Sequence, residues 1–476
     1  MRYKFLTLIA LLVITVSAKA QEKWGLLKCI EYAMANNISV KQTELQTNTA
    51  ELQLKQSKLG QLPNLNFSGG PAFANGRNQD PTTFSLITQS YLSANVQLQS
   101  SADIFNWFSK RNTVAANEWE VQAAKANVDK LKNDIALTVA NSYLQILLAL
   151  EQENIARVQL QQSQAQLSNT RKLVDAGSLP ELNAAELEAQ VARDSSSVIS
   201  AKGMLAQNIL NLKAYMALDA ATAFEIETPP VDKIPVDDIA DLQPENVYAL
   251  AIANMPQQKF NDYKIKAAEK TAAAAKGRMY PTISIFGSLG SRYNSRSQEV
   301  TGSTLINPPI GKVTVNAVDY NVFRLDPFPD YKYSKQPFFS QLNQNFNQSI
   351  GLTLSVPIFN GYQAKTNYER SRIGIRNQEL QKDLDNQTLK QNIYQAYNAA
   401  MVALETYNAG KKTLETADRT LNFAQKRYDV GMMSTFELIT NQNNLFRAKL
   451  QNVLNHFDYV FKMKVLEFYK GQGLKL

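Results

Sequence analysis

"KRYDVGMMSTFEL", residues 426–438, interrupts a long helical pattern with the tripeptide Asp-Val-Gly. An earlier stretch, "KLVDAGSLPELNA" at residues 172–184, interrupts a second helical pattern with Asp-Ala-Gly, and Gly177 and Gly431 lie 254 positions apart. Glycine commonly ends a helix because it adopts a positive φ without steric cost. The chain therefore reverses direction twice in the same manner, which indicates that one structural unit is duplicated.

The duplication extends well beyond the two turns. The tripeptide "IFN" at residues 104–106 recurs at 358–360, again with an offset of 254. Closer to the N-terminus the offset is 218, and it pairs Pro63 with Pro281. The difference of 36 residues is an insertion in the second copy, whose "INPPIGK" and "RLDPFPDYKYSKQPF" segments indicate a surface loop.

Two segments, near residues 91–105 and 348–359, alternate apolar and polar residues with a period of two, which predicts β-strands. The Pro-initiated segments near 63–73 and 281–290 are the predicted partner strands, so each copy has two strands. At roughly 3.3 Å per residue, a strand from Leu92 to Ile104 is about 43 Å long, which is sufficient to cross a bilayer while tilted.

The other segments show helical periodicity. In the first long segment, Val114, Val121, Val128 and Ile135 recur every seven residues, as in a coiled coil. Two uninterrupted helices of about 105 Å each are expected at ~1.5 Å per residue. The first repeat is predicted at 21–217, with helices near 24–60, 106–175 and 180–216. A Pro-rich non-helical segment at 218–242, which could form a belt, separates it from the second repeat at 243–470, with helices near 243–279, 360–429 and 434–470. A tail at 471–476 follows.

The first twenty residues have the composition of a secretory signal peptide. A basic start precedes the apolar run at 5–16, and Ala18-Lys19-Ala20 forms an Ala-x-Ala cleavage site. The apolar run is shorter than the roughly 17 to 25 residues of a transmembrane helix. Cys29, the only cysteine, lies beyond the predicted cleavage site and excludes an internal disulfide.

The net charge of +8 is not concentrated in any dense cluster of Lys and Arg with interleaved aromatic residues, so no nucleic-acid partner is expected. The predicted strands instead point to a membrane. Four strands cannot stand alone in a bilayer, because their open edges would leave backbone groups unpaired in hydrocarbon. Small bacterial barrels need at least eight strands. The chain is therefore expected to oligomerise and to pool its strands into one barrel.

The duplicated unit, the Pro-initiated strands, the helix openings "AMANN" and "AIANMP", and the two Asp-x-Gly turns together resemble the TolC family of outer-membrane efflux proteins. The resemblance implies a mostly α protein with a membrane β part. It also implies a homotrimer whose twelve strands form one barrel in outer-membrane lipid, above an α-barrel in the periplasm. The implied function is a passive exit duct that works with a periplasmic adaptor (a membrane fusion protein) and an inner-membrane pump of the RND or ABC type.

The same resemblance implies a gate beside the second turn. Glu437 stands where the family places an acidic constriction residue, and Tyr428 matches a tyrosine that helps to latch the closed tip. Thr440 and Asn183 occupy the other gate positions and are not acidic, so one carboxylate per subunit is expected. The residues expected to meet the adaptor are those of the two turns: Asp175, Gly177, Ser178, Leu179, Asp429, Gly431, Met432 and Met433.

No catalytic or cofactor motif accompanies these features. A phosphate-binding loop and a nucleophile elbow are both missing from the sequence, so neither an enzyme nor a cofactor is expected. One histidine, His456, and one cysteine cannot build a metal cluster. The adjacent Met432 and Met433 suit a Cu(I) path but are more typical of an adaptable contact surface. The alternative hypothesis is a periplasmic coiled-coil adaptor or spacer, although such proteins lack two pairs of Pro-initiated strands.

Overall fold

The computed structural model describes residues 23–80, 84–228 and 234–471. The predicted signal peptide and residues 472–476 of the predicted tail lie outside these described residues. The chain divides into two compact units. The helical unit comprises Met1–Gln53, Ala116–Ala268 and Ile373–Leu476, and the strand unit comprises Leu54–Ala115 and Glu269–Arg372.

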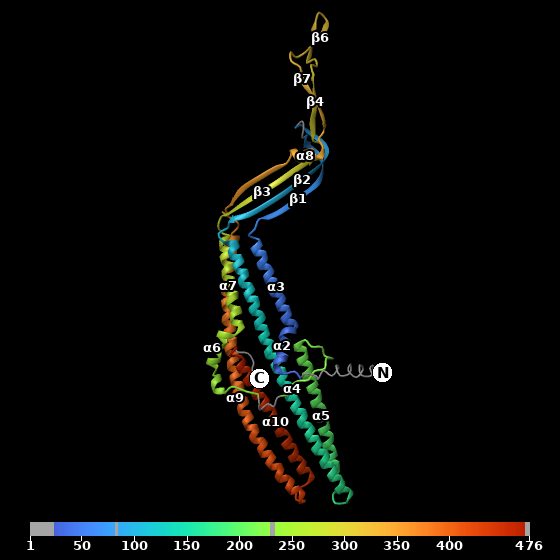
Figure 1. Cartoon of the computed structure of the whole chain (residues 1–476), viewed down its shortest axis with the longest axis vertical. Helices are drawn as coiled ribbons and strands as arrows, with labels where there is room; N and C mark the ends of the chain where they lie inside the picture. Colours follow the sequence, from blue (N-terminus) through green and yellow to red (C-terminus); the bar gives the residue numbers. More distant parts are fainter. Residues whose placement is uncertain (1–22, 81–83, 229–233, 472–476) are drawn as a thin grey trace, which may run out of the picture. The chain divides into compact units, whose positions relative to one another are not determined.

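Helices dominate the chain, as predicted, and α4 and α9 are the two long ones (Figure 1). Each has 67 residues, which corresponds to about 100 Å. In the described residues the helices are α2 (Leu26–Asn36), α3 (Ile38–Leu59), α4 (Ser109–Asp175), α5 (Glu181–Met216), the short 3₁₀ helix η2 (Ile239–Leu242), α6 (Pro244–Asn254), α7 (Pro256–Gly277), α8 (Phe338–Gln344), α9 (Gln363–Asp429) and α10 (Thr435–Phe468).

The long helices begin three residues later than predicted, at Ser109 and Gln363 rather than at 106 and 360. The delay has the same cause in both copies. Trp107 and Phe108 have φ of 50° and 59°, and their counterparts at 361 and 362 have φ of 62° and 60°. Left-handed residues cannot continue a right-handed helix, so each helix starts only after this pair.

The predicted helices near 24–60 and 243–279 are each broken in two. Asn37 leaves the helical region with ψ of 130°, and its side-chain oxygen accepts the N–H of Ser39 at 2.9 Å, which caps α3. The corresponding residue of the second copy, Met255, has ψ of 135°. It precedes Pro256, which disfavours the helical conformation of the residue before it. The breaks are therefore another shared feature of the two copies, although different side chains produce them.

Four strands form one antiparallel sheet in the order β1 (Asn64–Gln79), β2 (Leu86–Phe105), β3 (Thr282–Asn294) and β8 (Asn347–Ser355). The register aligns Phe67 with Leu98 and Leu98 with Leu289. Paired residues share a face, so one face carries the apolar side chains, among them Leu65, Phe67, Phe73, Leu92, Leu98, Ile283, Leu289, Ile350, Leu352 and Leu354. Within the described residues, neither β1 nor β8 pairs with a further strand along its outer edge.

The prediction that the insertion in the second copy forms a surface loop was wrong. The insertion contains β4 (Gln298–Ile306), paired with β7 (Phe328–Lys335), and β5 (Gly311–Val315), paired with β6 (Val318–Val322). Asn316 and Ala317, with φ of 52° and 61°, form the two-residue turn between β5 and β6. The Pro and Gly residues near this turn suggested a loop, but the alternation in "KVTV" and "VDYNV" is that of a hairpin.

One core cluster of the helical unit joins α2, α4, α5 and α10 around fully buried residues such as Cys29, Tyr143 and Leu212. The Tyr143 hydroxyl donates a hydrogen bond to the carbonyl of Glu227, in the segment predicted as a belt. In the seam predicted along α4, Val121 and Val128 are buried. No helix in the described ranges combines the length and apolar character that membrane crossing requires.

Candidate functional site

The two predicted turns share one backbone motif. Gly177 and Gly431 have φ of 73° and 74°. In both turns the residue after the glycine donates its N–H, at 2.8 Å, to the carbonyl oxygen five residues earlier, that of Leu173 or Arg427. This is the Schellman arrangement, in which a left-handed residue satisfies the last carbonyls of a helix. Any residue with a Cβ is strained at this φ, which explains why both copies use glycine.

The second turn starts α10 with a capping box. The Ser434 N–H donates to Glu437 Oε2 at 2.9 Å, and the Glu437 N–H donates to Ser434 Oγ at 3.2 Å. The bond from the Ser434 backbone, with help from its hydroxyl and from nearby Arg427, holds the pKa of Glu437 below its usual value. Glu437, predicted as the gate acid, therefore also has a structural role as the cap of α10.

The first turn is held differently. Pro180 precedes α5 and provides no side-chain cap, and Asn183 occupies the position that corresponds to Glu437. Arg171 of α4 reaches across to α5, where it pairs with Glu181 and, at 2.7 Å, with Glu188. These contacts, the hydrogen bond to Glu181 above all, raise the pKa of Arg171. The first hairpin is thus joined across its two helices by an ion-pair cluster, which we call the Arg171 clamp.

The remaining predicted gate residues lie apart. The Tyr428 hydroxyl is 3.5 Å from Oγ1 of the buried Thr435, so this tyrosine contacts its own hairpin. Thr440 is exposed and donates its hydroxyl to the Phe436 carbonyl at 2.8 Å. Among the described residues, no hydrogen bond links Tyr428, Glu437, Thr440 and Asn183 to one another. One chain therefore supplies separate parts of the predicted gate rather than an assembled one.

Apolar side chains are exposed around both turns. The exposed fractions are 67% for Val430, 68% for Met432 and 65% for Phe436 at the second turn, and 65% for Leu182 at the first. Of the other predicted contact residues, Asp175, Ser178 and Asp429 are exposed, whereas Leu179 and Met433 are half-buried. Among the described residues, no three side chains of His, Cys, Asp or Glu are grouped so that they could hold a metal ion. The turns have the character of a contact surface.

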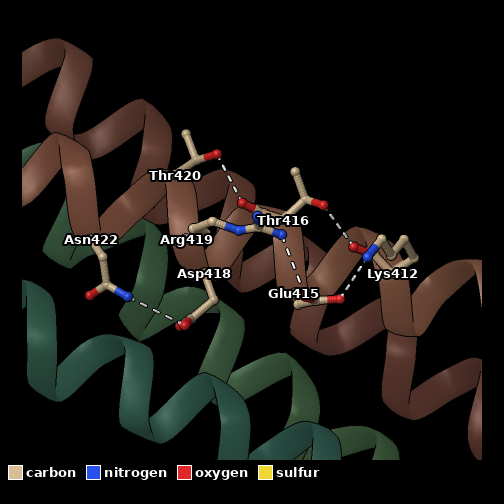
Figure 2. Close-up of polar contacts among 7 residues, drawn as sticks. All are labelled: Lys412, Glu415, Thr416, Asp418, Arg419, Thr420 and Asn422. Carbon is tan, nitrogen blue, oxygen red and sulfur yellow. Dashed lines mark hydrogen bonds and ion pairs between the residues drawn. The ribbon is translucent and has the colours of Figure 1, made fainter.

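A polar groove lies between α9 and α10 above the second turn. Its volume is about 400 Å³, and its lining includes Lys412, Thr416 and Thr420 of α9 and Asn441 and Asn444 of α10. Figure 2 shows that the neighbouring polar side chains of α9 have partners within the same helix. Glu415 accepts from Lys412 at 3.1 Å and from Arg419 at 3.4 Å, and Asp418 accepts from Asn422. The hydroxyls of Thr416 and Thr420 donate to the backbone carbonyls four residues earlier. Lys412 in particular lowers the pKa of Glu415. Exposed pairs of this kind stabilise a helix only slightly, and the charged side chains that form them stay at the surface beside the groove.

Sequence reasoning missed a buried polar network that joins α4, α5 and α10. Asp194 of α5 accepts the Ser163 hydroxyl and, at 2.8 Å, the amide of Gln190. Gln190 and Asn443 of α10 exchange two hydrogen bonds, at 3.1 and 3.3 Å. A signal was present, because Gln190 and Asp194 continue the buried stripe of Ala184, Leu187 and Val198 along α5. Polar residues in such a stripe need partners, and here the partner connects the two hairpins.

The sequence matches the model of a known family, described as outer membrane efflux protein, over residues 29–218 and 247–460. The two matched segments correspond to the two copies of the repeat. Among curated proteins, the outer membrane efflux protein BepC of Brucella suis is 20% identical over 373 residues, covering 77% of this chain and 69% of BepC. The probable outer membrane lipoprotein SilC of Salmonella typhimurium is 24% identical over 279 residues, and the match spans 58% of each protein.

Solved structures show the same fold. A crystal structure of CusC superposes with a TM-score of 0.74 at 16% identity, covering 96% of both chains. The CmeC outer membrane channel of Campylobacter jejuni gives a TM-score of 0.72 at 15% identity, covering 94% of this chain and 86% of CmeC. The open state of the MtrE outer membrane channel of Neisseria gonorrhoeae gives a TM-score of 0.70 at 17% identity, covering 94% of this chain and 89% of MtrE.

Proposed function

Since the chain belongs to the outer membrane efflux protein family, we propose that it is the outer-membrane exit duct of a tripartite efflux or type I secretion system. The resemblance predicted from the sequence is thereby confirmed. In this proposal three copies surround one lumen, and the chain itself performs no chemistry. A periplasmic adaptor and an inner-membrane pump of the RND or ABC type supply the substrate and the energy.

The observation that carries the proposal is the amphipathic sheet with two open edges. Its apolar face is exposed, with 72% of Phe67 and 80% of Ile350 accessible. The opposite face carries small polar residues such as Ser93, Gln97 and Thr353. A lipid-facing surface on one side and a wet lumen on the other account for this pattern. Pairing β8 of one copy with β1 of the next removes both open edges of this four-stranded sheet, and three copies give twelve strands.

The proposed gate acts through the two turns. Adaptor contacts at the exposed apolar residues of the turns and at the polar groove beside α10 draw the hairpins outward and widen the tip. Glu437 is the only acid among the predicted gate positions, so it contributes one negative charge per subunit. The Arg171 clamp holds the first hairpin together, which leaves the second hairpin as the more mobile part of the gate.

The test is conductance in planar bilayers, with paired substitutions on neighbouring residues of β8. Leu352 lies on the apolar face and Thr353 on the polar face. An Arg on the lipid-facing side costs about 2–4 kcal/mol near the bilayer midplane. We expect Leu352→Arg to abolish heat-modifiable trimers, and Thr353→Arg to leave trimers with altered ion preference. Absence of a trimer-sized conductance in the unsubstituted protein would refute the proposal. A protein released from membranes by mild washing would favour the periplasmic adaptor hypothesis instead.

A further inference from the structure

The inserted strands build a two-stranded extension that we call the ribbon, residues 298–335 (Figure 1). Its tip, β5 and β6, alternates strictly. Val313 pairs with Tyr320 and Val315 with Val318, so these side chains share one face with Val322. Lys312, Thr314, Asp319 and Asn321 occupy the opposite face, where the Thr314 hydroxyl donates to Asp319 at 2.6 Å.

The base of the ribbon is fixed to the sheet. Gln341 of α8 is fully buried, accepts the Asn294 N–H at 2.9 Å and donates to the Gln336 carbonyl at 3.0 Å. The Gln336 N–H in turn donates to the Ser297 carbonyl at 3.0 Å. These bonds connect the end of β3, the start of β4 and the end of β7. The ribbon is therefore a positioned element of the strand unit rather than a loose connection.

The apolar face of the tip is not covered by any described part of the chain. Every residue of β5 and β6 is exposed, including 50% of Val313, 52% of Val318 and 58% of Tyr320. A lone two-stranded hairpin is at best marginally stable in water. An apolar face on such a hairpin indicates a partner surface.

The net charge of the ribbon and its position in the chain next to β8 indicate what covers its apolar face. The ribbon contains four basic and four acidic residues, so it has no net attraction to an anionic membrane surface and no net repulsion from another ribbon. Only the short α8 and four further residues separate the ribbon from β8, an edge strand that must pair with a neighbouring copy if the barrel forms. Three ribbons would therefore stand close together around one axis.

We propose that the apolar faces of β5 and β6 from three copies pack against one another and cover the outer mouth of the duct. The partner of this surface is thus a second and a third copy of the same chain. This inference rests on the proposed function, because it needs the trimeric barrel to bring the ribbons together.

Disulfide trapping tests the proposal in the purified full-length protein. Val318 and Asp319 are neighbours on β6 with side chains on opposite faces. The native Cys29 is fully buried, and burial raises the pKa of its thiol to about 12, so it stays unreactive. Oxidation should cross-link Val318→Cys into dimers, at most one pair per trimer, whereas Asp319→Cys should remain uncross-linked. Equal cross-linking of both variants, or of neither, overturns the proposal.

The native mass of the same samples distinguishes a failure of the proposed ribbon contact from a failure of the proposed trimeric duct. Trimers that give no Val318→Cys dimers overturn the ribbon contact alone and leave the duct intact. Monomers overturn the proposed function and the ribbon contact together. As a second measurement, a variant without residues 307–325 should remain trimeric and show a higher open conductance than the full chain. An unchanged conductance in that variant shows that the ribbons do not cover the mouth, and overturns the proposal.

Discussion

The substitution Asn443→Ala tests whether the gate opens by separating α5 from α10. Asn443 and the buried Gln190 exchange two hydrogen bonds, at 3.1 and 3.3 Å. Each is worth about 1 kcal/mol net. Asn443 is half-buried and Gln190 keeps its bonds to Asp194 and Arg193, so water and the remaining partners recover part of the loss. The closed arrangement should lose about 1–2 kcal/mol per subunit.

If opening breaks this amide pair, that loss shifts the closed–open equilibrium of each subunit by about 5- to 30-fold toward the open state, because an equilibrium moves by the difference in interaction free energy between its states. The measurement is the open probability of single channels in planar bilayers. Asn444→Ala is the matched control, since Asn444 is the adjacent and exposed residue of α10. Open probabilities that are equal in the two variants would show that α5 and α10 move as one body, and the reasoning would fail.

Three further predictions concern the turns and the ribbon. Glu437→Gln should weaken cation preference, measured as the reversal potential in a salt gradient. In the unsubstituted protein that cation preference should persist at pH 4.5 and disappear only at lower pH, because the pKa of Glu437 lies below its usual value of 4.5. If the Glu437→Gln variant has the same reversal potential as the unsubstituted protein, Glu437 is a helix cap only. Arg171→Gln should speed amide hydrogen exchange in residues 172–183, and high salt should do the same to the unsubstituted chain, whereas equal protection in both proteins would show that the clamp is not needed. Ala317→Gly should stabilise the tip of the ribbon by about 1 kcal/mol, because glycine tolerates the φ of 61° at this position, and slower hydrogen exchange in β5 and β6 measures the gain; unchanged exchange would argue against strain there.

The sequence predicted most of the architecture because each main element has a single strong period. The apolar alternation of β2 and the equivalent pattern in β8 follow directly from a sheet with one wet face. The two helix-ending glycines are local signals that need no tertiary information. The repeat adds an independent check, since Gly177 and Gly431 occupy the same position in their copies.

Features decided by packing were not predictable in this way. The break at Asn37 depends on a side chain that caps one helix and also donates to the Tyr215 carbonyl at 2.8 Å. The Arg171 clamp requires α4 and α5 to lie in register, so that Glu188, seventeen positions away, comes within 2.7 Å. The strands of the ribbon were not predicted because the turn between β5 and β6 uses Asn316 and Ala317 rather than a glycine. The nearby prolines indicated a loop more strongly than the short alternating pattern indicated strands.

The two turns show how a duplicated unit acquires different mechanical properties without changing its backbone. Both copies keep the glycine and the two helix-ending hydrogen bonds, because the reversal itself depends on them. The copies differ in what joins the helices on either side. Arg171 links α4 to α5, whereas the corresponding Gln425 bonds to Asp429 within α9, at 2.8 Å. The capping box of the second turn likewise lies within a single segment at the start of α10. Near the turn, separating α9 from α10 therefore breaks neither of these contacts and gives up the 3.5 Å contact between the Tyr428 and Thr435 hydroxyls, while separating α4 from α5 breaks both ion pairs of the clamp. A gate built from both hairpins should accordingly open at the second one first.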